Sequence, residues 1–185
     1  MILVRHGESR FNEAFHRDRV DPGIPDAPLT ELGTRQALGT AAGLAERDLR
    51  HIVSSPYTRA LQTASIIAEV LGLSIEVDPL VGERAAMSCD IGTPVTGLAA
   101  DWPQLDFTRL PERWWPEPDE PEANLHRRAA EFRARMAAVP DRDRLLVVSH
   151  WGFIRALTGH EVHNCGVVHY PLTAPEPIRA HRPWR

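Results

Sequence analysis

Short apolar runs alternate with helix-like segments along most of the chain. The clearest run is LLVVS at residues 145–149, which is unbroken and has the length of a buried strand. Shorter runs bounded by polar or turn-forming residues predict further strands. These are expected at residues 1–4, 51–55, 74–77 and 166–172. Strands this short and this apolar are expected to form a sheet that is covered on both faces.

Two segments between the strands have the periodicity of helices. In residues 57–71 apolar side chains recur three and four positions apart, and Gly72 follows as a C-cap. A second helix is expected from Thr30 and Glu31 to about residue 47. Its inward positions are Leu32, Ala37, Ala41, Leu44 and Ala45. Because parallel strands need crossover helices, this alternation predicts an α/β fold, a three-layer α/β/α sandwich with a mainly parallel central sheet.

Two segments interrupt the alternation. Residues 18–28, DRVDPGIPDAP, are rich in turn-forming residues, and residues 103–123 carry Trp114 and Trp115 among prolines and acids. Long irregular connections in a compact domain are more often functional loops or lids than accidents. We therefore expect the second segment to cover a pocket, with its tryptophans in a packed corner. The tail from Pro171 is expected to run over the surface.

Length, composition and charge narrow the class of protein. With 185 residues, 43% of them hydrophobic, the chain suits one domain that spans residues 1–185. The formal net charge of −4 and the lack of a long basic block argue against nucleic acid or an anionic membrane as a partner. No uncharged run is long enough to span a bilayer, so a soluble cytoplasmic protein is expected. The oligomeric state stays open, homo-oligomers included.

The basic residues, cysteines and histidines of the sequence argue against several kinds of functional site. The 21 basic residues are all arginine, so the chain has neither a Schiff-base lysine nor the lysine of a P-loop. The two cysteines do not form a CxxC pair and are expected to be reduced thiols. A histidine group near the C-terminus lacks the pattern of a zinc site and is expected at the surface. This group is His160, His163 and His169. The arginines expected on the solvated face of one helix are Arg127, Arg128, Arg133 and Arg135.

Polar signatures follow three of the predicted parallel strands. These signatures are Arg5-His6-Gly7, Ser54-Ser55-Pro56 and Ser149-His150. The carboxyl ends of parallel strands line the ligand crevice of an open sheet. Arg5, His6 and His150 are therefore expected to converge. Arg59, in the first turn of the helix after SSP, is expected to face the same anion as that helix N-terminus.

Two arginines and two histidines beside a helix N-terminus suit a phosphate group. Guanidinium groups match phosphate oxygens in shape, stay charged at every working pH and spread the negative charge. A neutral histidine can also attack phosphorus. Both cysteines lack a neighbouring base and the sequence contains no GxSxG motif, so no better nucleophile is present.

These residues resemble the motifs of the histidine phosphatase (phosphoglycerate mutase-like) superfamily. The resemblance begins with LVRHGES at residues 3–9 and Asn12, and continues with LTELG at residues 29–33. It extends to SSP with Arg59 and to SHWG at residues 149–152. The four landmarks occur in the family's order and cover most of the first 157 residues.

The resemblance implies a role for individual residues. His6 would be the nucleophile that becomes phosphohistidine, while Arg5, Arg59 and His150 would cradle the transferring phosphoryl group. The predicted substrate-binding residues are Gly7, Ser9, Asn12 and Trp151. Neither the formation nor the hydrolysis of phosphohistidine needs a metal or another cofactor, because the arginines supply the charge that metal ions supply elsewhere.

The family also needs a carboxyl group that protonates the leaving oxygen and then activates water. Glu83, in LVGERAAM, matches the usual position on the loop after the third strand, and Asp90 is its competitor. Another family position for the acid, directly after the second histidine, is filled here by Trp151. This departure favours Glu83 and makes Trp151 a wall for an organic substrate. A general acid needs a pKa near the working pH, which burial raises and neighbouring cations lower.

The resulting interpretation is a phosphomonoester hydrolase that acts on a small phosphorylated metabolite through phosphohistidine. The alternative is a cofactor-dependent phosphoglycerate mutase, which returns the phosphoryl group to a bound product, but its substrate-binding insertion is not recognisable in this chain. A non-catalytic phosphate-binding regulatory module is disfavoured by the intact histidines and arginines. A phosphatase for phosphohistidine in proteins is disfavoured by the expected covered pocket.

Overall fold

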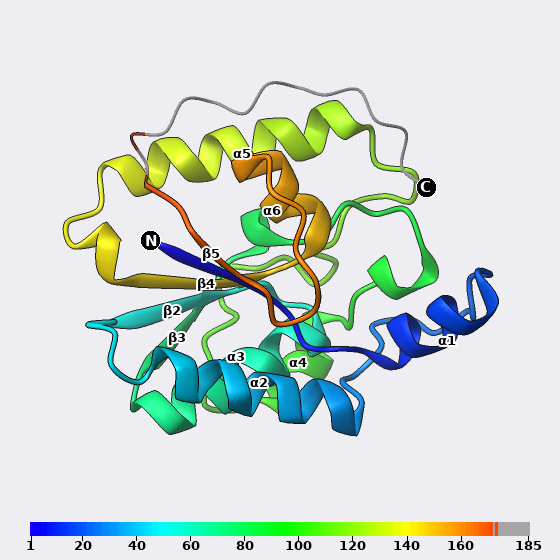
Figure 1. Ribbon diagram of the computed structural model, residues 1–185. Helices are drawn as coiled ribbons and strands as arrows, with labels where there is room; N and C mark the ends of the chain where they lie inside the picture. Colours follow the sequence, from blue (N-terminus) through cyan, green and yellow to red (C-terminus); the bar gives the residue numbers. More distant parts are fainter. Residues whose placement is uncertain (172, 174–185) are drawn as a thin grey trace.

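The computed structural model describes residues 1–171 and residue 173. Its centre is a five-stranded sheet with the strand order β3-β2-β4-β1-β5 (Figure 1). The strands are β1 (Ile2–Arg5), β2 (His51–Ser54), β3 (Ser74–Val77), β4 (Leu145–Ser149) and β5 (Val167–His169). β1 to β4 pair in parallel, whereas β5 pairs antiparallel with β1 at the edge. The predicted mainly parallel sheet is confirmed.

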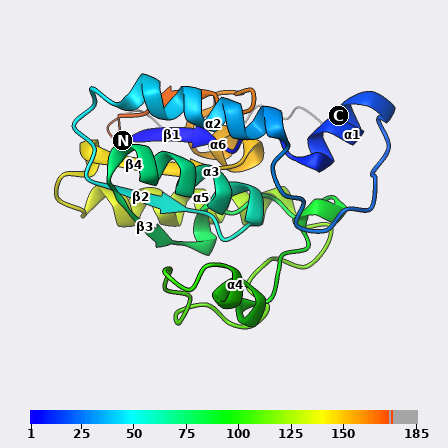
Figure 2. The ribbon, with the colours of Figure 1, turned by 90° about the horizontal axis from the view of Figure 1, so that it is seen from below.

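Helices cover both faces of this sheet. They are α1 (Arg10–Asp18), α2 (Glu31–Leu44), α3 (Thr58–Leu71), α4 (Val95–Asp101), α5 (Glu122–Ala137) and α6 (Trp151–Thr158). Short 3-10 turns are η1 (Pro79–Val81), η2 (Ser88–Asp90) and η3 (Arg142–Arg144). α5 and α6 lie on one face and α2 and α3 on the other, which confirms the three-layer α/β/α sandwich (Figure 1). α1 lies beyond the carboxyl end of β1, and α4 lies apart from the sheet (Figure 2).

The sheet divides the apolar core into two clusters. Successive side chains of a strand point to opposite faces. Leu3 and Val147 therefore pack with Phe153 on the α5–α6 side, whereas Val4 packs with Ile67 on the α2–α3 side. All residues of β4 are buried. This burial on both faces explains why β4 has the most continuous apolar run in the sequence.

The helix predicted at residues 57–71 is confirmed, with a one-residue difference at its start. α3 begins at Thr58, and Tyr57 is the N-cap residue. It ends at Leu71, and Gly72 follows in the left-handed conformation with φ 66°. Glycine adopts this conformation without a Cβ clash, so the sequence ends the helix where the backbone must turn.

The second predicted helix is confirmed, but two of its expected inward residues are wrong. α2 starts after Thr30, whose hydroxyl accepts a hydrogen bond from the Gly33 N–H at 3.0 Å. Its buried row is Gly33, Ala37, Ala41 and Leu44. Leu32 precedes this row and is 43% exposed. Ala45 is exposed because the helix ends at Leu44 and not near residue 47.

The irregular segment with the two tryptophans forms a packed corner. Trp114 is buried, its ring meets Tyr57 edge-on with 4.7 Å between centroids, and its Nε1 donates to the Thr93 carbonyl. Leu98 of α4 belongs to the same apolar cluster. The segment therefore packs against α3 and α4, as its tryptophans led us to expect.

The C-terminal part of the predicted pattern is described only in part. β5 covers Val167–His169, which is shorter than the strand expected at residues 166–172. Leu172 and most of the tail from Pro171 lie outside the described residues. Within the described part of the chain, no helix is both long and apolar enough to cross a membrane. Both cysteines are buried free thiols.

Candidate active site

The carboxyl ends of β1 and β4 bring the two predicted histidines together. Arg5 and Ser149 are partners in the parallel register, and the His6 N–H donates to the Ser149 carbonyl at 2.9 Å. Each histidine directly follows its strand, so the two rings come within 5.1 Å between centroids. Adjacent parallel strands thus place residues from opposite ends of the chain in one site, as expected from the strand-end signatures.

The His6 side chain is held as a neutral imidazole with one nitrogen left for chemistry. It is 4% exposed, and its Nδ1 lies 2.7 Å from the Gly7 carbonyl oxygen. A carbonyl can only accept, so Nδ1 carries the proton and Nε2 keeps its lone pair. Burial lowers the pKa of His6 well below its ordinary value, and the charges of Arg59 and Arg5 lower it further. A neutral ring of this kind can act as a nucleophile.

His150 is fully buried beside His6 and presents an unsatisfied nitrogen. Its Nε2 lies 2.8 Å from the Ser55 hydroxyl, while its buried Nδ1 has no hydrogen-bond partner within the described residues. The Ser55 hydroxyl can donate to Nε2 or accept from it, and where it donates the ring proton lies on Nδ1. Burial lowers the pKa of His150 well below its ordinary value, as do the Arg59 charge and the neighbouring His6. A buried donor without an acceptor is costly, and a phosphoryl oxygen would satisfy it.

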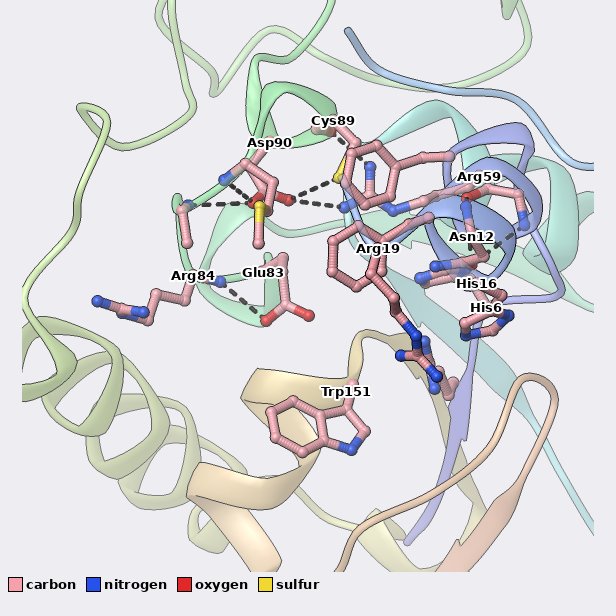
Figure 3. A pocket seen from close by; sticks show the side chains of 16 residues that line it. His6, Asn12, His16, Arg19, Arg59, Glu83, Arg84, Cys89, Asp90 and Trp151 are labelled. Carbon is pink, nitrogen blue, oxygen red and sulfur yellow. Dashed lines mark hydrogen bonds and ion pairs between the residues drawn. The ribbon is translucent and has the colours of Figure 1, made fainter. Parts of the chain in front are cut away.

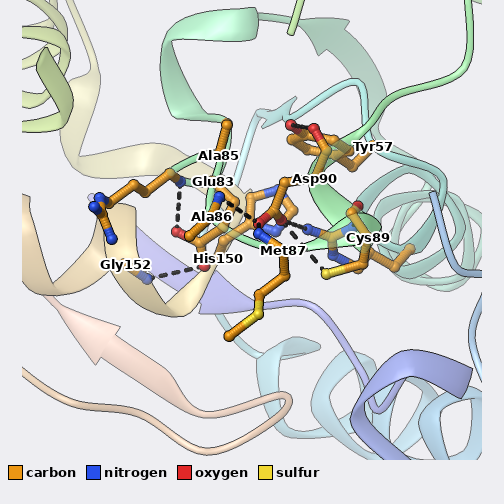
Figure 4. A network of polar contacts seen from close by, with 12 residues as sticks. Tyr57, Glu83, Ala85, Ala86, Met87, Cys89, Asp90, His150 and Gly152 are labelled. Carbon is orange, nitrogen blue, oxygen red and sulfur yellow. Dashed lines mark hydrogen bonds and ion pairs between the residues drawn. The ribbon is translucent and has the colours of Figure 1, made fainter. Parts of the chain in front are cut away.

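Arg59 on α3 is fixed by the segment that carries Asp90. Its Nη1 donates to the Cys89 carbonyl at 2.7 Å, its Nη2 meets Asp90 Oδ1 at 3.1 Å, and its guanidinium carbon lies 4.5 Å from the Tyr57 ring centroid. The other Asp90 oxygen accepts from the backbone N–H groups of Ala86 and Met87 (Figure 4). Both Asp90 oxygens are thus engaged, and this carboxylate orients Arg59 and closes the loop.

Glu83 lines the cavity, as Asp90 does. One oxygen accepts from the Arg84 N–H at 2.9 Å and the other from the Gly152 N–H at 3.1 Å, at the start of α6 (Figure 4). Burial raises the pKa of Glu83, and the negative charge of Asp90 raises it further. A carboxyl group that holds its proton to higher pH is suited to general acid chemistry. The two acids thus differ in their partners, because Asp90 pairs with Arg59 whereas Glu83 accepts from two backbone N–H groups.

Arg5 completes the positive end of the site. Its Nη1 donates to the Val162 carbonyl at 3.0 Å, which anchors the side chain to the loop before β5. Its Nε is buried and has no partner within the described residues. A fixed guanidinium with an unused donor is suited to an oxyanion.

Ser9 and Asn12 form the N-terminal cap of α1. The Asn12 N–H donates to the Ser9 hydroxyl, and Asn12 Oδ1 accepts from the Ser9 N–H at 3.1 Å and from Asn164 Nδ2 at 3.1 Å. These bonds fix which end of the amide is oxygen, so the Asn12 NH2 group is the end left for a ligand. The Ser9 hydroxyl is already used in the cap.

Gly7 has a packing role that its sequence position did not reveal. A Cβ on Gly7 would lie 2.5 Å from the Gly33 carbonyl oxygen, and a Cβ on Gly33 would lie 2.1 Å from the Glu8 carbonyl oxygen. The Gly7 N–H donates to the Thr63 hydroxyl at 3.0 Å. The two glycines therefore let the segment after β1 lie directly on the start of α2, and the Gly7 N–H already has a partner.

Most of the side chains described above line one cavity of about 340 Å³. Its lining includes Arg5, His6, Ser9, Asn12, Arg59, Glu83 and Trp151. Figure 3 shows His6 and Asn12 on one side, with Glu83 opposite and Trp151 between them at the rim. The structure thus assembles most of the predicted site residues around a single space.

The comparisons with known proteins agree with this geometry. The family model described as histidine phosphatase superfamily (branch 1) matches residues 1–169. The chain belongs to the histidine phosphatase superfamily. Members of this superfamily include phosphatases and phosphoglycerate mutase-like enzymes, and the chain is accordingly an enzyme.

Similar proteins carry both kinds of name. A probable phosphoglycerate mutase of Yersinia pestis is 44% identical over 83 residues, which cover 45% of this chain and only 37% of that protein. A mycobacterial glucosyl-3-phosphoglycerate phosphatase is 25% identical with a TM-score of 0.62, covering 90% of this chain and 87% of that one. A phosphoserine phosphatase mutant from Entamoeba histolytica, at 19% identity, TM-score 0.61 and coverages of 90% and 87%, shares the fold.

Within this histidine phosphatase, α1 contributes cavity residues that the sequence analysis missed. Phe11, Phe15, His16 and Arg19 line the cavity together with Met87 (Figure 3). Apolar residues four positions apart after the Ser9 cap were a signal for this helix. The expectation that residues 103–123 cover the pocket is wrong, because Trp114 and Trp115 do not belong to the lining of the cavity. They pack on Tyr57 and α4, and α1 and the loop at residues 84–90 flank the cavity in their place.

The expectation that four arginines of α5 share a solvated face is wrong for one of them. Arg128 is only 9% exposed, and it forms an ion pair with Glu120 at 3.0 Å. Its side chain points into the molecule because α5 packs over the loop that carries Glu83. Arg127 and Arg135 are exposed and Arg133 is half-buried. The histidines His160, His163 and His169 are exposed, and among the described residues no group of three or more His, Cys, Asp or Glu could hold a metal ion.

Proposed function

We propose that this histidine phosphatase hydrolyses the phosphomonoester of a small phosphorylated metabolite through a phosphohistidine at His6. The observation that carries the proposal is the state of His6. It is a buried neutral imidazole whose Nδ1 is held by the Gly7 carbonyl, and it lines a cavity that Glu83 also lines. A nucleophile and an acid across one cavity are what phosphoryl transfer to nitrogen requires.

In the first step, His6 Nε2 attacks phosphorus as the ester P–O bond breaks. The N–P bond forms with the nitrogen lone pair, and the leaving oxygen takes the proton of Glu83. Arg5, Arg59 and His150 Nδ1 stabilise the charge on the oxygens of the transferring group. Because His6 is neutral beforehand, no proton must leave the ring before it attacks.

In the second step, water attacks phosphorus and the N–P bond breaks. The Glu83 carboxylate accepts a proton from this water, which makes the new O–P bond possible and returns Glu83 to its protonated form. Inorganic phosphate leaves, and the electron pair of the broken bond returns to Nε2. One carboxyl group thus serves both steps, consistent with its position across the cavity from His6.

The outer part of the cavity supports a small substrate over a protein. Phe15, Met87 and Trp151 supply apolar walls, and His16 and Arg19 supply polar groups near them. A volume of about 340 Å³ is at the lower end of ordinary small-molecule sites. The phosphatases named above act on glucosyl-3-phosphoglycerate and phosphoserine, which are small phosphorylated metabolites. We extend this class of substrate to the present chain.

Hydrolysis is favoured over mutase activity by the access of water to the cavity. A mutase must keep water from phosphohistidine until the product takes the phosphoryl group. Here His16, Arg19 and Met87 line the cavity and are exposed to solvent. The mutase-named relative is matched over only 37% of its length, so its activity is not carried over to this chain.

Several further expectations belong to this proposal. The reaction uses no metal, because Arg5 and Arg59 line the cavity, His150 lies beside His6, and these groups supply the charge stabilisation that a metal ion would supply. The enzyme is one cytoplasmic domain that binds neither nucleic acid nor membranes, and the negative net charge supports this.

The experiment is a phosphate-release screen over sugar phosphates, nucleotides, phosphoglycerates and phosphopeptides. The wild type is expected to release phosphate from one class of small phosphomonoester, and His6→Ala is expected to abolish this release. His160→Ala, an exposed histidine far along the chain from the motif, is the matched control and should keep full activity. Interconversion of phosphoglycerates with little phosphate release would show a mutase, and release that survives in His6→Ala would contradict the mechanism.

A further inference from the structure

One buried ion pair lies behind the proposed acid and is not used by the chemistry described above. Arg128 comes from the middle of α5, and Glu120 comes from the loop just before that helix. The two residues are 9% and 5% exposed, and the Arg128 Nη2 lies 3.0 Å from Glu120 Oε2. The Arg128 Nε also donates to Glu120 Oε1 at 3.2 Å. The ion pair is therefore bidentate, with two guanidinium nitrogens each donating to one carboxylate oxygen.

The same guanidinium holds the backbone on which Glu83 sits. Its Nη1 donates to the carbonyls of Leu80 and Gly82, both at 2.9 Å, and its Nη2 donates to the Glu83 carbonyl at 3.1 Å. These carbonyls lie in a turn that no strand pairs with, so a side chain must supply their donors. One arginine thus satisfies the turn on both sides of the proposed acid.

Glu120 holds the residues that follow Glu83. Its Oε2 accepts from the Ala85 N–H at 3.3 Å, its own N–H donates to the Ala85 carbonyl at 2.9 Å, and its carbonyl accepts from Arg84 Nε at 2.8 Å. The pair therefore forms hydrogen bonds with the residues before and after Glu83. The Glu83 carboxylate is left to point away from the pair, toward the Gly152 N–H and the cavity.

We infer that the Arg128–Glu120 pair is a positioning element for proton transfer, which sets where the Glu83 carboxyl group stands relative to the leaving oxygen. This inference rests on the proposed function, in which Glu83 is the acid. A buried ion pair contributes little net stability because desolvation of both charges offsets their attraction. The pair instead fixes the geometry of the loop, since only arginine offers enough donors in one plane for one carboxylate and three carbonyls.

The test uses Arg128→Lys, which keeps the charge but loses the fork, and aryl phosphates of different leaving groups. With phenyl phosphate, a poor leaving group, turnover should fall by about ten- to a hundredfold, the cost of a misplaced catalytic group. With dinitrophenyl phosphate, which leaves without a proton, the burst of dinitrophenolate should keep its wild-type rate. Only the steady state after the burst should slow, because Glu83 must still activate water.

A double-mutant cycle separates positioning from general damage. If Arg128 acts through Glu83, then Arg128→Lys should add less than about threefold to the loss caused by Glu83→Gln. Arg127→Lys is the matched control, because Arg127 is the neighbouring residue and is exposed, and it should leave every rate unchanged. A dinitrophenolate burst slowed as much as phenyl phosphate turnover, or multiplying losses in the double variant, would contradict the inference.

A second variant guards against misfolding of Arg128→Lys. Glu120→Gln has nearly the same shape, but it removes the negative charge of the pair and replaces one acceptor oxygen with an NH2 group, so it should produce a loss with the same dependence on the leaving group. Its thermal melting is measured beside that of the wild type. If Glu83→Gln itself has no effect on phenyl phosphate turnover, the proposed acid is wrong and this inference is overturned with it. If Glu83→Gln is impaired but both pair variants behave as wild type, only the positioning element is refuted.

Discussion

The two ends of the cavity are built in different ways. At the phosphoryl end, His6 and His150 follow directly from two hydrogen-bonded strands, so the parallel register fixes their separation. At the leaving-group end, Glu83 stands on a loop that is held by side chains from distant parts of the chain, chiefly Arg128. The positions of these two histidines are therefore set by the sheet. The leaving-group end can be changed without changing the sheet, which suits a site where the phosphate is constant and the attached group varies.

This comparison predicts that changes at the phosphoryl end affect all substrates alike. Arg59→Lys should lower kcat/KM by about a hundred- to a thousandfold, because it removes a planar donor pair from the transition state and weakens the contact with Asp90. The measurement is kcat/KM for phenyl and dinitrophenyl phosphate. A loss restricted to one of the two would break the proposed division between the two ends.

Changes at the leaving-group end should depend on the substrate. Glu83→Gln is expected to slow phenyl phosphate turnover by about a hundredfold or more, the usual contribution of a general acid, and to spare the burst with dinitrophenyl phosphate. Asp90→Asn, the matched carboxylate change, should lower activity with both substrates and lower the melting temperature, because Asp90 closes the loop and pairs with Arg59. If Asp90→Asn shows the dependence on the leaving group and Glu83→Gln does not, the two roles are exchanged.

In the pH profile of kcat/KM, the ascending limb should report His6 and the descending limb should report Glu83. The first step needs neutral His6 and protonated Glu83. As pH rises, kcat/KM should rise while His6 loses its proton, at a pH below the ordinary histidine value of about 6.5. It should then fall as Glu83 loses its proton, above the ordinary glutamate range, by about tenfold per pH unit. Glu83→Gln should abolish the descending limb and leave the ascending one. A descending limb unchanged in this variant would show that another group titrates.

The smallest effect is expected at the cavity rim. Arg19 is exposed and lines the cavity from the end of α1. Arg19→Gln should raise KM severalfold for phosphoserine and leave kcat unchanged, since an exposed cation contributes modestly to binding a carboxylate. Phosphoethanolamine lacks the carboxylate and should respond less. Equal changes in KM for the two compounds would show that Arg19 does not contact the leaving group.

The sequence predicted the phosphoryl end because that end is made of contiguous motifs. RHG and SHWG each end an apolar strand, and SSP with Arg59 begins a helix, so the rule that strand ends meet in a parallel sheet was sufficient. The fold followed from the same alternation. The choice of Glu83 over Asp90 rests on their contacts, since Asp90 pairs with the Arg59 guanidinium whereas Glu83 is held by two backbone N–H groups.

The residues that sequence analysis misplaced are those fixed by long-range packing. Arg128 looks like any arginine of a polar helix, and only the placement of α5 over the Glu83 loop buries it. Leu32 is apolar but lies on the opposite side of α2 from Ala41, and the inward row includes Gly33, which approaches the Glu8 backbone closely. The Trp114 segment was expected over the pocket, but an apolar cluster with Tyr57 holds it beside α3.

The central claim is that phosphoryl transfer passes through His6. It is tested most directly by mixing Glu83→Gln with a radiolabelled phosphomonoester of a good leaving group, quenching in alkali within milliseconds and locating the label on the digested protein. The account predicts label on His6 that accumulates because its hydrolysis is slowed, is stable in alkali and is lost in acid. Label on any other residue, or full release of phosphate without labelled protein, would contradict it.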